Sequence, residues 1–532
     1  MKKFLAVILS MTLMLTLGTA TFGAQKTLPS GKDTGSINVT NLKPGDTVTA
    51  YQFVKADYNE YGFTGYSAIN NYVKDPVAPT AQEVIDMASN AVTMTVAAEK
   101  KVATGDTEVT LNGLPVGYYL VMVTSGSETV YSPMIAGIYY SKSATDNTLT
   151  NGAISADSDF EIKAQKCWAK SSTPKLEKTI VTPSSKNSKG DDIAIGDKIT
   201  FNLSATVPSY SKEYKKVTYK IYDIMSEGLD YVDGSMKCFI EKYENNRENI
   251  KVAPKVNGGI IEITFDSKFI LEHPGQKIQV EYQAKLNEKA GVNFDANINK
   301  AYLEYSNNPA SGSTAKTGED KVYVYTFGID SNLFGKSTEK WNEKTKELIK
   351  VEEGEYQWVE TEKESGIFTT TTALEGATFT LTNNKTKKSY TATSDKYGYL
   401  KFTGLDAGEY TLQETDAPDG FTLNDAKHTV VITAEYNQDG TLKSYTIKID
   451  DKATSTYTAT YDKGVIKTIT STKDSQGNIS ESAILKNSKM SFLPSTGGVG
   501  TTIFAIVGVV FVAVALGLHM ILRGKSKLEQ DR

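Results

Sequence analysis

Residues 176–180 read Leu-Glu-Lys-Thr-Ile, and apolar and polar side chains alternate along this run. Alternation with a period of two is typical of a β-strand that has one face in a core. Similar short runs, separated by Gly, Asn and Asp, recur at Tyr118–Val123, Lys198–Leu203, Lys277–Ala284 and Ala377–Leu381. Long helical periodicity is absent from residues 25–491, so the pattern predicts an all-β protein built of β-sandwiches in series.

The composition narrows the classes of protein to which the chain can belong. Its 532 residues suffice for roughly three or four domains, and 30 Tyr and 19 Phe favour β-structure. A net charge of −5 gives no electrostatic basis for binding nucleic acid. Two Cys and three His exclude a disulfide scaffold and leave little for histidine-based catalysis, so neither a metal nor a cofactor is expected.

Residues 1–24 have the layout of a secretory signal peptide. Two lysines after the initial Met are followed by the apolar run Phe4–Leu17 and then by small residues. Cleavage after Ala20 fits the small-residue rule better than cleavage after Ala24, and both sites stay open. The chain is therefore expected to be exported.

The other end, residues 491–532, carries an apolar span at Val499–Leu522, long enough to cross a bilayer as a helix. Three basic residues follow it at once: Arg523, Lys525 and Lys527. Such charges hold a tail on the cytoplasmic side of the membrane. Directly before the span stand Leu493, Pro494, Ser495, Thr496 and Gly497.

Taken together, this C-terminal arrangement resembles the cell-wall sorting signal of Gram-positive surface proteins, which is an LPxTG motif, an apolar span and a basic tail. The resemblance implies that a sortase cuts between Thr496 and Gly497 and passes the Thr496 acyl group to an amine. The span would then be left behind as a temporary membrane anchor. The expected location is the cell wall of a Gram-positive bacterium.

The segment between the two ends divides into three predicted domains, at residues 25–173, 174–330 and 331–490. A short polar stretch before Pro174 marks the first boundary, and the end of the strand Val322–Tyr325 marks the second. Residues 337–372 are polar and charged and are predicted to form a hairpin or surface insertion. One short helix is predicted at Ala81–Ala88 in the first domain.

Two of these domains resemble modules of Gram-positive major pilins. Residues 178–330 look like a fimbrial isopeptide-forming domain and residues 374–487 like a CnaB-type domain. The stretches that carry the resemblance are Ile195–Asp197, Val207–Pro208, Tyr222–Leu229, Tyr305–Pro309, Leu374–Phe379 and Gly408–Thr415. The resemblance implies three tandem immunoglobulin-like or CnaB-type sandwiches arranged in a rod.

Strand parity places three polar residues of the middle domain in its core. Lys178, Asp223 and Asn307 each lie in phase with apolar neighbours on their predicted strands. Buried unpaired charges are costly, so these side chains are expected to meet. A neutral Lys178 amine could attack the Asn307 carbonyl while Asp223 moves protons, giving an isopeptide bond. The pilin resemblance implies the same three roles.

In the last domain the resemblance implies a second such set. Glu414 is in phase with Tyr410 and Leu412 and matches the acid of the family, and Asn487 matches its acceptor. The lysine is expected to be Lys350, with Lys336 as the alternative.

Pilins also need a lysine that accepts the Thr496 acyl group of the next subunit. Lys166 stands at roughly the right place, at the end of the first domain, with Lys163 and Lys170 as rivals. The two cysteines, Cys167 and Cys238, either pair in the exported protein or stay as separate buried thiols.

These observations favour the major structural subunit of a covalently polymerised surface pilus that supports adhesion. The expected partners are pilin-polymerising and housekeeping sortases, identical subunits, accessory or tip pilins, and peptidoglycan. The chain is not expected to be an enzyme apart from its self-crosslinking. The alternative is a monomeric wall-anchored adhesin, whereas the lack of a nucleophile motif disfavours a surface hydrolase.

Overall fold

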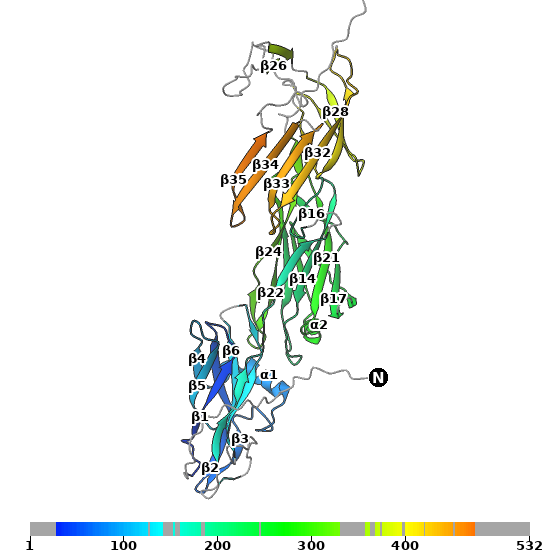
Figure 1. Ribbon diagram of the computed structural model, residues 1–532. Helices are drawn as coiled ribbons and strands as arrows, with labels where there is room; N and C mark the ends of the chain where they lie inside the picture. The colour runs from blue at the N-terminus through cyan, green and yellow to red at the C-terminus, as the bar shows by residue number, and fades with distance from the viewer. Residues whose placement is uncertain are drawn as a thin grey trace, which may run out of the picture.

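The computed structural model of the chain describes residues 28–329 and 357–473, with internal gaps. The gaps are 126–127, 142–152, 155–159, 182–186, 244–245, 362–367, 373–374, 396–399, 420 and 451–452. Strands make up nearly all regular structure and form three bodies in a row (Figure 1). The prediction of tandem β-sandwiches in a rod is confirmed. The predicted signal peptide and membrane span lie outside the described residues. Among the residues that are described, no helix is long and apolar enough to cross a membrane.

The first body is a sandwich built around buried residues such as Ile37, Tyr119 and Ile138. A larger sheet has the order β3-β2-β6-β8-β9 with β4 beside β2, a smaller one has the order β10-β1-β5, and β7 pairs with β11. The strands are β1 (Thr34–Thr40), β2 (Thr47–Asn59), β3 (Gly62–Ala68), β4 (Val96–Lys101), β5 (Glu108–Pro115), β6 (Gly117–Thr124), β7 (Val130–Tyr131), β8 (Met134–Ser141), β9 (Glu161–Ala164), β10 (Lys166–Trp168) and β11 (Ser171–Ser172).

The predicted short helix is present as α1 (Ala81–Ser89), followed by the single turn η1 (Ala91–Thr93). Its N-terminus is fixed by a capping box, in which Thr80 and Glu83 each accept a hydrogen bond from the other's backbone N–H. The apolar face of the helix covers Leu120 of β6.

The middle body consists of two larger sheets that face each other across one core. One sheet has the order β12-β14-β21-β17-β18 with β16 beside β21, and the other has the order β13-β24-β22-β15-β20-β19 with β23 beside β22. The strands of the first sheet are β12 (Leu176–Ile180), β14 (Lys198–Thr206), β16 (Leu229–Tyr231), β17 (Lys237–Tyr243), β18 (Asn246–Ile250) and β21 (Lys277–Leu286). Those of the second are β13 (Gly190–Asp192), β15 (Tyr219–Met225), β19 (Lys255–Asn257), β20 (Ile260–Thr264), β22 (Asn297–Asn308), β23 (Ser313–Lys316) and β24 (Asp320–Tyr325), and a short helix, α2 (Ser267–Glu272), follows β20.

The last body is dominated by a seven-stranded sheet of order β29-β28-β31-β32-β33-β34-β35. Its strands are β28 (Thr378–Asn383), β29 (Ser389–Thr393), β31 (Gly408–Asp416), β32 (Lys427–Tyr436), β33 (Leu442–Ile449), β34 (Ala453–Asp462) and β35 (Val465–Lys473). A second layer is formed by β25 (Phe327–Ile329) and β30 (Phe402–Leu405). Because β25 pairs here, the chain enters the last body a few residues before the boundary predicted at 330. The strands β26 (Gln357–Thr361) and β27 (Phe368–Thr372) form a hairpin within the predicted insertion.

The middle and last bodies are held together at a junction centred on Asp192. Its carboxylate accepts hydrogen bonds from the Tyr436 hydroxyl (2.6 Å) and from the backbone N–H of Ala407, both in the last body. Close beside it, Gly440 has a φ of +90°, and a Cβ there would lie 2.2 Å from the carbonyl oxygen of Lys189. Glycine is therefore required at position 440 for this close approach. Burial raises the pKa of Asp192 to about 6.

This raised pKa makes the stability of the protein depend on pH in the acid range. Between about pH 4 and 6 the folded protein holds a proton on Asp192 that the unfolded chain releases, so the free energy of unfolding should rise as the pH falls. We expect a gain of about 1–3 kcal/mol across this window, measured by denaturant unfolding. Asp192→Asn should flatten this dependence, whereas Glu435→Gln, at an exposed ion pair of the last body, should preserve it. An unchanged profile in Asp192→Asn would contradict the assignment.

Candidate functional site

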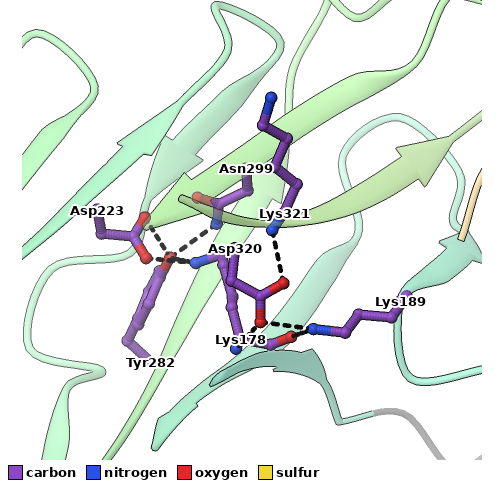
Figure 2. Close-up of polar contacts among 7 residues, drawn as sticks. All are labelled: Lys178, Lys189, Asp223, Tyr282, Asn299, Asp320 and Lys321. Atoms are coloured by element: carbon purple, nitrogen blue, oxygen red, sulfur yellow. Dashed lines mark hydrogen bonds and ion pairs between the residues drawn. The ribbon is translucent and has the colours of Figure 1, made fainter. Parts of the chain in front are cut away.

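Four polar side chains meet in the centre of the middle body, and none of them has any exposed surface. Lys178 on β12 and Tyr282 on β21 come from one sheet, and Asp223 on β15 and Asn299 on β22 come from the facing sheet. Figure 2 shows the four side chains converging between the sheets. We call these residues the core cluster.

Strand alternation explains why the cluster lies in the core. On β12, Lys178 shares the buried face with Leu176 and Ile180, while Glu177 is exposed. On β15, Asp223 alternates with half-buried residues in the same way. The predictions that Lys178 and Asp223 are buried and that they meet are confirmed.

The core cluster is hydrogen-bonded around the Tyr282 hydroxyl. Lys178 Nζ donates to Asp223 Oδ2 and, over 3.0 Å, to the Tyr282 oxygen. The Tyr282 hydroxyl donates to Asp223 Oδ1 over 2.7 Å and accepts from Asn299 Nδ2 over 2.7 Å. A phenol has one proton and two lone pairs, so these three bonds use its whole capacity.

Aromatic rings enclose the amine and keep water away from it. Lys178 Nζ lies 4.9 Å from the ring centroid of Phe201 and 5.2 Å from that of Tyr282. Burial lowers the pKa of Lys178, and the charge of Asp223 opposes this effect. Loss of one proton to Asp223 would leave a neutral amine, which is the nucleophilic form.

A second set of contacts fixes the backbone of β12 at Lys178. Asp320 accepts from the Lys178 backbone N–H over 2.7 Å and from Lys189 Nζ over 2.6 Å. Lys189 Nζ also donates to the carbonyl oxygen of Lys178 over 2.6 Å. Both backbone polar groups of Lys178 are thus satisfied by the side chains of Asp320 and Lys189, which are drawn in Figure 2.

The structure does not bring Asn307 to the core cluster. Asp223 is paired with Ala301, and Asn307 lies six residues further along β22, about 20 Å away at 3.3 Å per residue. Asn299 lies two residues from Ala301 in the other direction and on the same face. The prediction that Asn307 completes the cluster is therefore corrected, since Asn299 takes that position.

Comparisons with known proteins agree with this architecture. Three family models match the chain: a T6 antigen Ig-like domain at residues 32–171, a prealbumin-like fold domain at 357–450 and an LPXTG cell wall anchor motif at 486–527. The trypsin-resistant surface T6 protein of Streptococcus pyogenes serotype M6 is 26% identical over 549 aligned positions, covering 93% of this chain and 96% of the relative. The chain is a homologue of the Gram-positive backbone pilins.

A solved structure supports the fold of this pilin. The structure of the T6 backbone pilin of serotype M6 Streptococcus pyogenes superposes with a TM-score of 0.57 at 20% identity, covering 87% of this chain and all of that one. At this identity the likeness concerns the fold alone. The anchor motif match identifies the pilin as a cell-wall-anchored surface protein of a Gram-positive bacterium.

The predicted acid of the last body is buried in the pilin as well. Glu414 on β31 is 2% exposed and lies in phase with Tyr410 and Leu412, which have no exposed surface. Its carboxylate accepts from the backbone N–H of Asn424 over 2.7 Å. The predicted partners of Glu414, namely Lys350 or Lys336 and Asn487, lie outside the described residues.

The candidate inter-subunit lysines lie at the end of the first body. Lys166 is exposed on β10 and Lys170 is exposed just after it, whereas Lys163 on β9 is half-buried. The two cysteines are free thiols buried in the cores of different bodies, so the pairing alternative is wrong. Burial raises the pKa of both Cys167 and Cys238 to about 12.

Because the ion pair between Lys178 and Asp223 is fully buried, removing one of its charges should destabilise the protein more than removing both. Lys178→Met should leave the Asp223 carboxylate buried without its cation, whereas Lys178→Met combined with Asp223→Asn removes both charges. We expect the double variant to exceed the single variant by about 2–4 kcal/mol in free energy of unfolding, measured with denaturant. The same pair of changes at the surface bridge between Lys220 and Glu262 should differ by less than about 1 kcal/mol. Equal stability of both core variants would refute the effect.

Proposed function

We propose that this pilin forms the shaft of a covalently polymerised pilus and that an isopeptide bond between Lys178 and Asn299 locks its middle body. The observation that carries the proposal is the fully buried pair of Lys178 and Asp223 beside the Asn299 amide. Lys178 Nζ and Asn299 Nδ2 both lie within hydrogen-bonding distance of one oxygen, that of Tyr282.

The reaction needs no cofactor. The Lys178 ammonium gives one proton to Asp223, and the neutral amine attacks Cγ of Asn299 as a nucleophile. The Cγ–Nζ bond forms, the Cγ–Nδ2 bond breaks, and ammonia leaves with the electron pair and one further proton from Nζ. Asp223 acts as the general acid and base of this self-crosslinking, and the pilin turns over no external substrate.

The bond would join the first strand of the middle body, β12, to β22 in the opposite sheet. By analogy with a disulfide, closing a loop of roughly 100 residues stabilises the fold by on the order of 5 kcal/mol. Unlike a disulfide, an amide cannot be reduced. This suits a surface fibre whose two described cysteines stay unpaired.

We infer a second isopeptide bond in the last body, with Glu414 as its acid. The burial of Glu414, which is only 2% exposed, supports its role as the acid. Lys350, or Lys336 as the alternative, and Asn487 are the proposed partners.

Polymerisation would join Thr496 of one subunit to Lys166 of the next, through a pilin-polymerising sortase. Exposure of Lys166 on β10 leaves its amine open to an acyl-enzyme. A housekeeping sortase would then attach the finished polymer to peptidoglycan, with accessory or tip pilins as further partners. Support of adhesion is the proposed role of the fibre. The second candidate function is a monomeric wall-anchored adhesin.

The internal bond can be tested by intact mass. The wild-type chain should be lighter by one ammonia for the middle-body bond, and a peptide that joins Lys178 to Asn299 should be found after digestion. Asn299→Ala should restore the lost mass and remove that peptide. Asn307→Ala is the matched control and should leave both unchanged. A wild-type digest in which Lys178 and Asn299 occur only in separate peptides would refute the bond.

Polymerisation can be tested by gel electrophoresis of wall extracts boiled in detergent. The wild type should give a ladder, and Thr496→Ala should give neither a ladder nor wall-linked protein because the acyl donor is lost. Lys166→Ala should give a wall-linked monomer, because the donor and acceptor sites are separate. A ladder in Lys166→Ala would move the acceptor to Lys163 or Lys170. A single monomer band in the wild type would favour the adhesin.

A further inference from the structure

Among the described residues, only the Tyr282 hydroxyl is hydrogen-bonded to all three other members of the core cluster. The two oxygens of Asp223 accept hydrogen bonds from different residues: Oδ2 accepts from Lys178 and Oδ1 from Tyr282. Within the described structure no hydrogen bond joins Asp223 directly to Asn299, and the Asn299 oxygen has no partner. Tyr282 is therefore the link between the acid and the leaving nitrogen (Figure 2).

The chemistry of the bond requires such a link. An amide nitrogen leaves as ammonia only after it gains a proton, because the amide anion is too strong a base to leave. The first proton lost from Nζ is taken up by Asp223 on Oδ2, the oxygen that Lys178 contacts. This proton must then reach Nδ2, and the Tyr282 hydroxyl is the group bonded both to Asp223 and to Nδ2.

We propose that Tyr282 is a catalytic residue of the isopeptide reaction, which carries a proton from Asp223 to the Asn299 nitrogen. This inference rests on the proposed Lys178–Asn299 bond. Attack on Cγ makes Nδ2 pyramidal, so its lone pair can then accept a proton. As the Cγ–Nδ2 bond breaks, the Tyr282 hydroxyl gives its proton to Nδ2. The Asp223 carboxyl, turned so that its protonated oxygen faces Tyr282, returns to the phenol the proton that it took from Nζ, so the phenol is unchanged at the end. Nζ has then lost two protons: one leaves with ammonia, and the other rests on the Asp223 carboxyl.

The distances and the protonation state fit this role. Both bonds of the relay measure 2.7 Å, inside the range over which proton transfer occurs. Burial, with the charge of Asp223 adding to it, raises the pKa of Tyr282 well above its ordinary value. Tyr282 thus holds its proton at neutral pH and transfers it only as another arrives.

The test is the rate of crosslinking in the full chain with Tyr282→Phe, which removes the hydroxyl and keeps the ring. Newly made chains are pulse-labelled, and the Lys178–Asn299 peptide is quantified by mass spectrometry from minutes to days. Proton transfer typically contributes 10²–10⁴-fold, so we expect crosslinking to be slower by about 100-fold or more. Tyr219→Phe is the matched control, because Tyr219 lies in the same core and its hydroxyl has no hydrogen-bond partner there. It should crosslink at the wild-type rate.

The outcomes separate this inference from the proposed function. A wild type without the crosslinked peptide refutes the bond itself. A wild type that crosslinks, together with Tyr282→Phe that crosslinks equally fast, overturns the role of Tyr282 and leaves the bond standing.

Folding of Tyr282→Phe is checked by the protease resistance of its middle body. If that variant does not fold, 3-fluorotyrosine is placed at position 282, since it keeps the ring and the hydroxyl but is a stronger acid. A crosslinking rate changed at least threefold, with no change when 3-fluorotyrosine is placed at position 219, supports the relay. An unchanged rate overturns it.

Discussion

Burying the Lys178 ammonium between two sheets removes it from water, and the middle body is arranged to offset that cost. Asp223 supplies the opposite charge, Tyr282 supplies a hydrogen-bond acceptor, and two aromatic rings cover the amine. Such a pair gains little stability over apolar packing but is costly to break, because the remaining charge is stranded. The arrangement is better explained by chemistry than by stability. The burial that makes the charged amine costly also lowers its pKa, and so favours the neutral, nucleophilic form.

Strand parity was sufficient to place Lys178, Asp223 and Glu414 in their cores, because alternation is a local property that the sequence displays directly. Parity was not sufficient to select the amide. Asn299 and Asn307 are an even number of residues apart, so alternation alone assigns both to the same face of a strand. The choice between them depends on the register of β22 against β15, in which Ala301 is paired with Asp223. Register between strands so far apart in sequence is set by the packing of the whole body.

Tyr282 illustrates a second limit of the sequence. The run Lys277–Ala284 predicted its strand, but an inward tyrosine in a strand is an ordinary core residue, and no local signal distinguishes one that contacts a lysine on another strand. The predicted boundary at residue 173 already assigned Cys167 and Cys238 to different domains, but only the structure shows that each thiol is buried in its own core. The short helix at α1, by contrast, carries its own local signal in the capping pair of Thr80 and Glu83.

The position of β12 has a mechanical consequence. The chain leaves the first body at β11 and enters the middle body through β12, so a pull along the fibre reaches Lys178 before most other residues of that body. If Lys178 is joined to Asn299, the force passes straight to β22, whose neighbour β24 leads into the last body. The 179–298 segment is then bypassed. Its hydrogen bonds carry no tension, and its length is not available for the fibre to stretch.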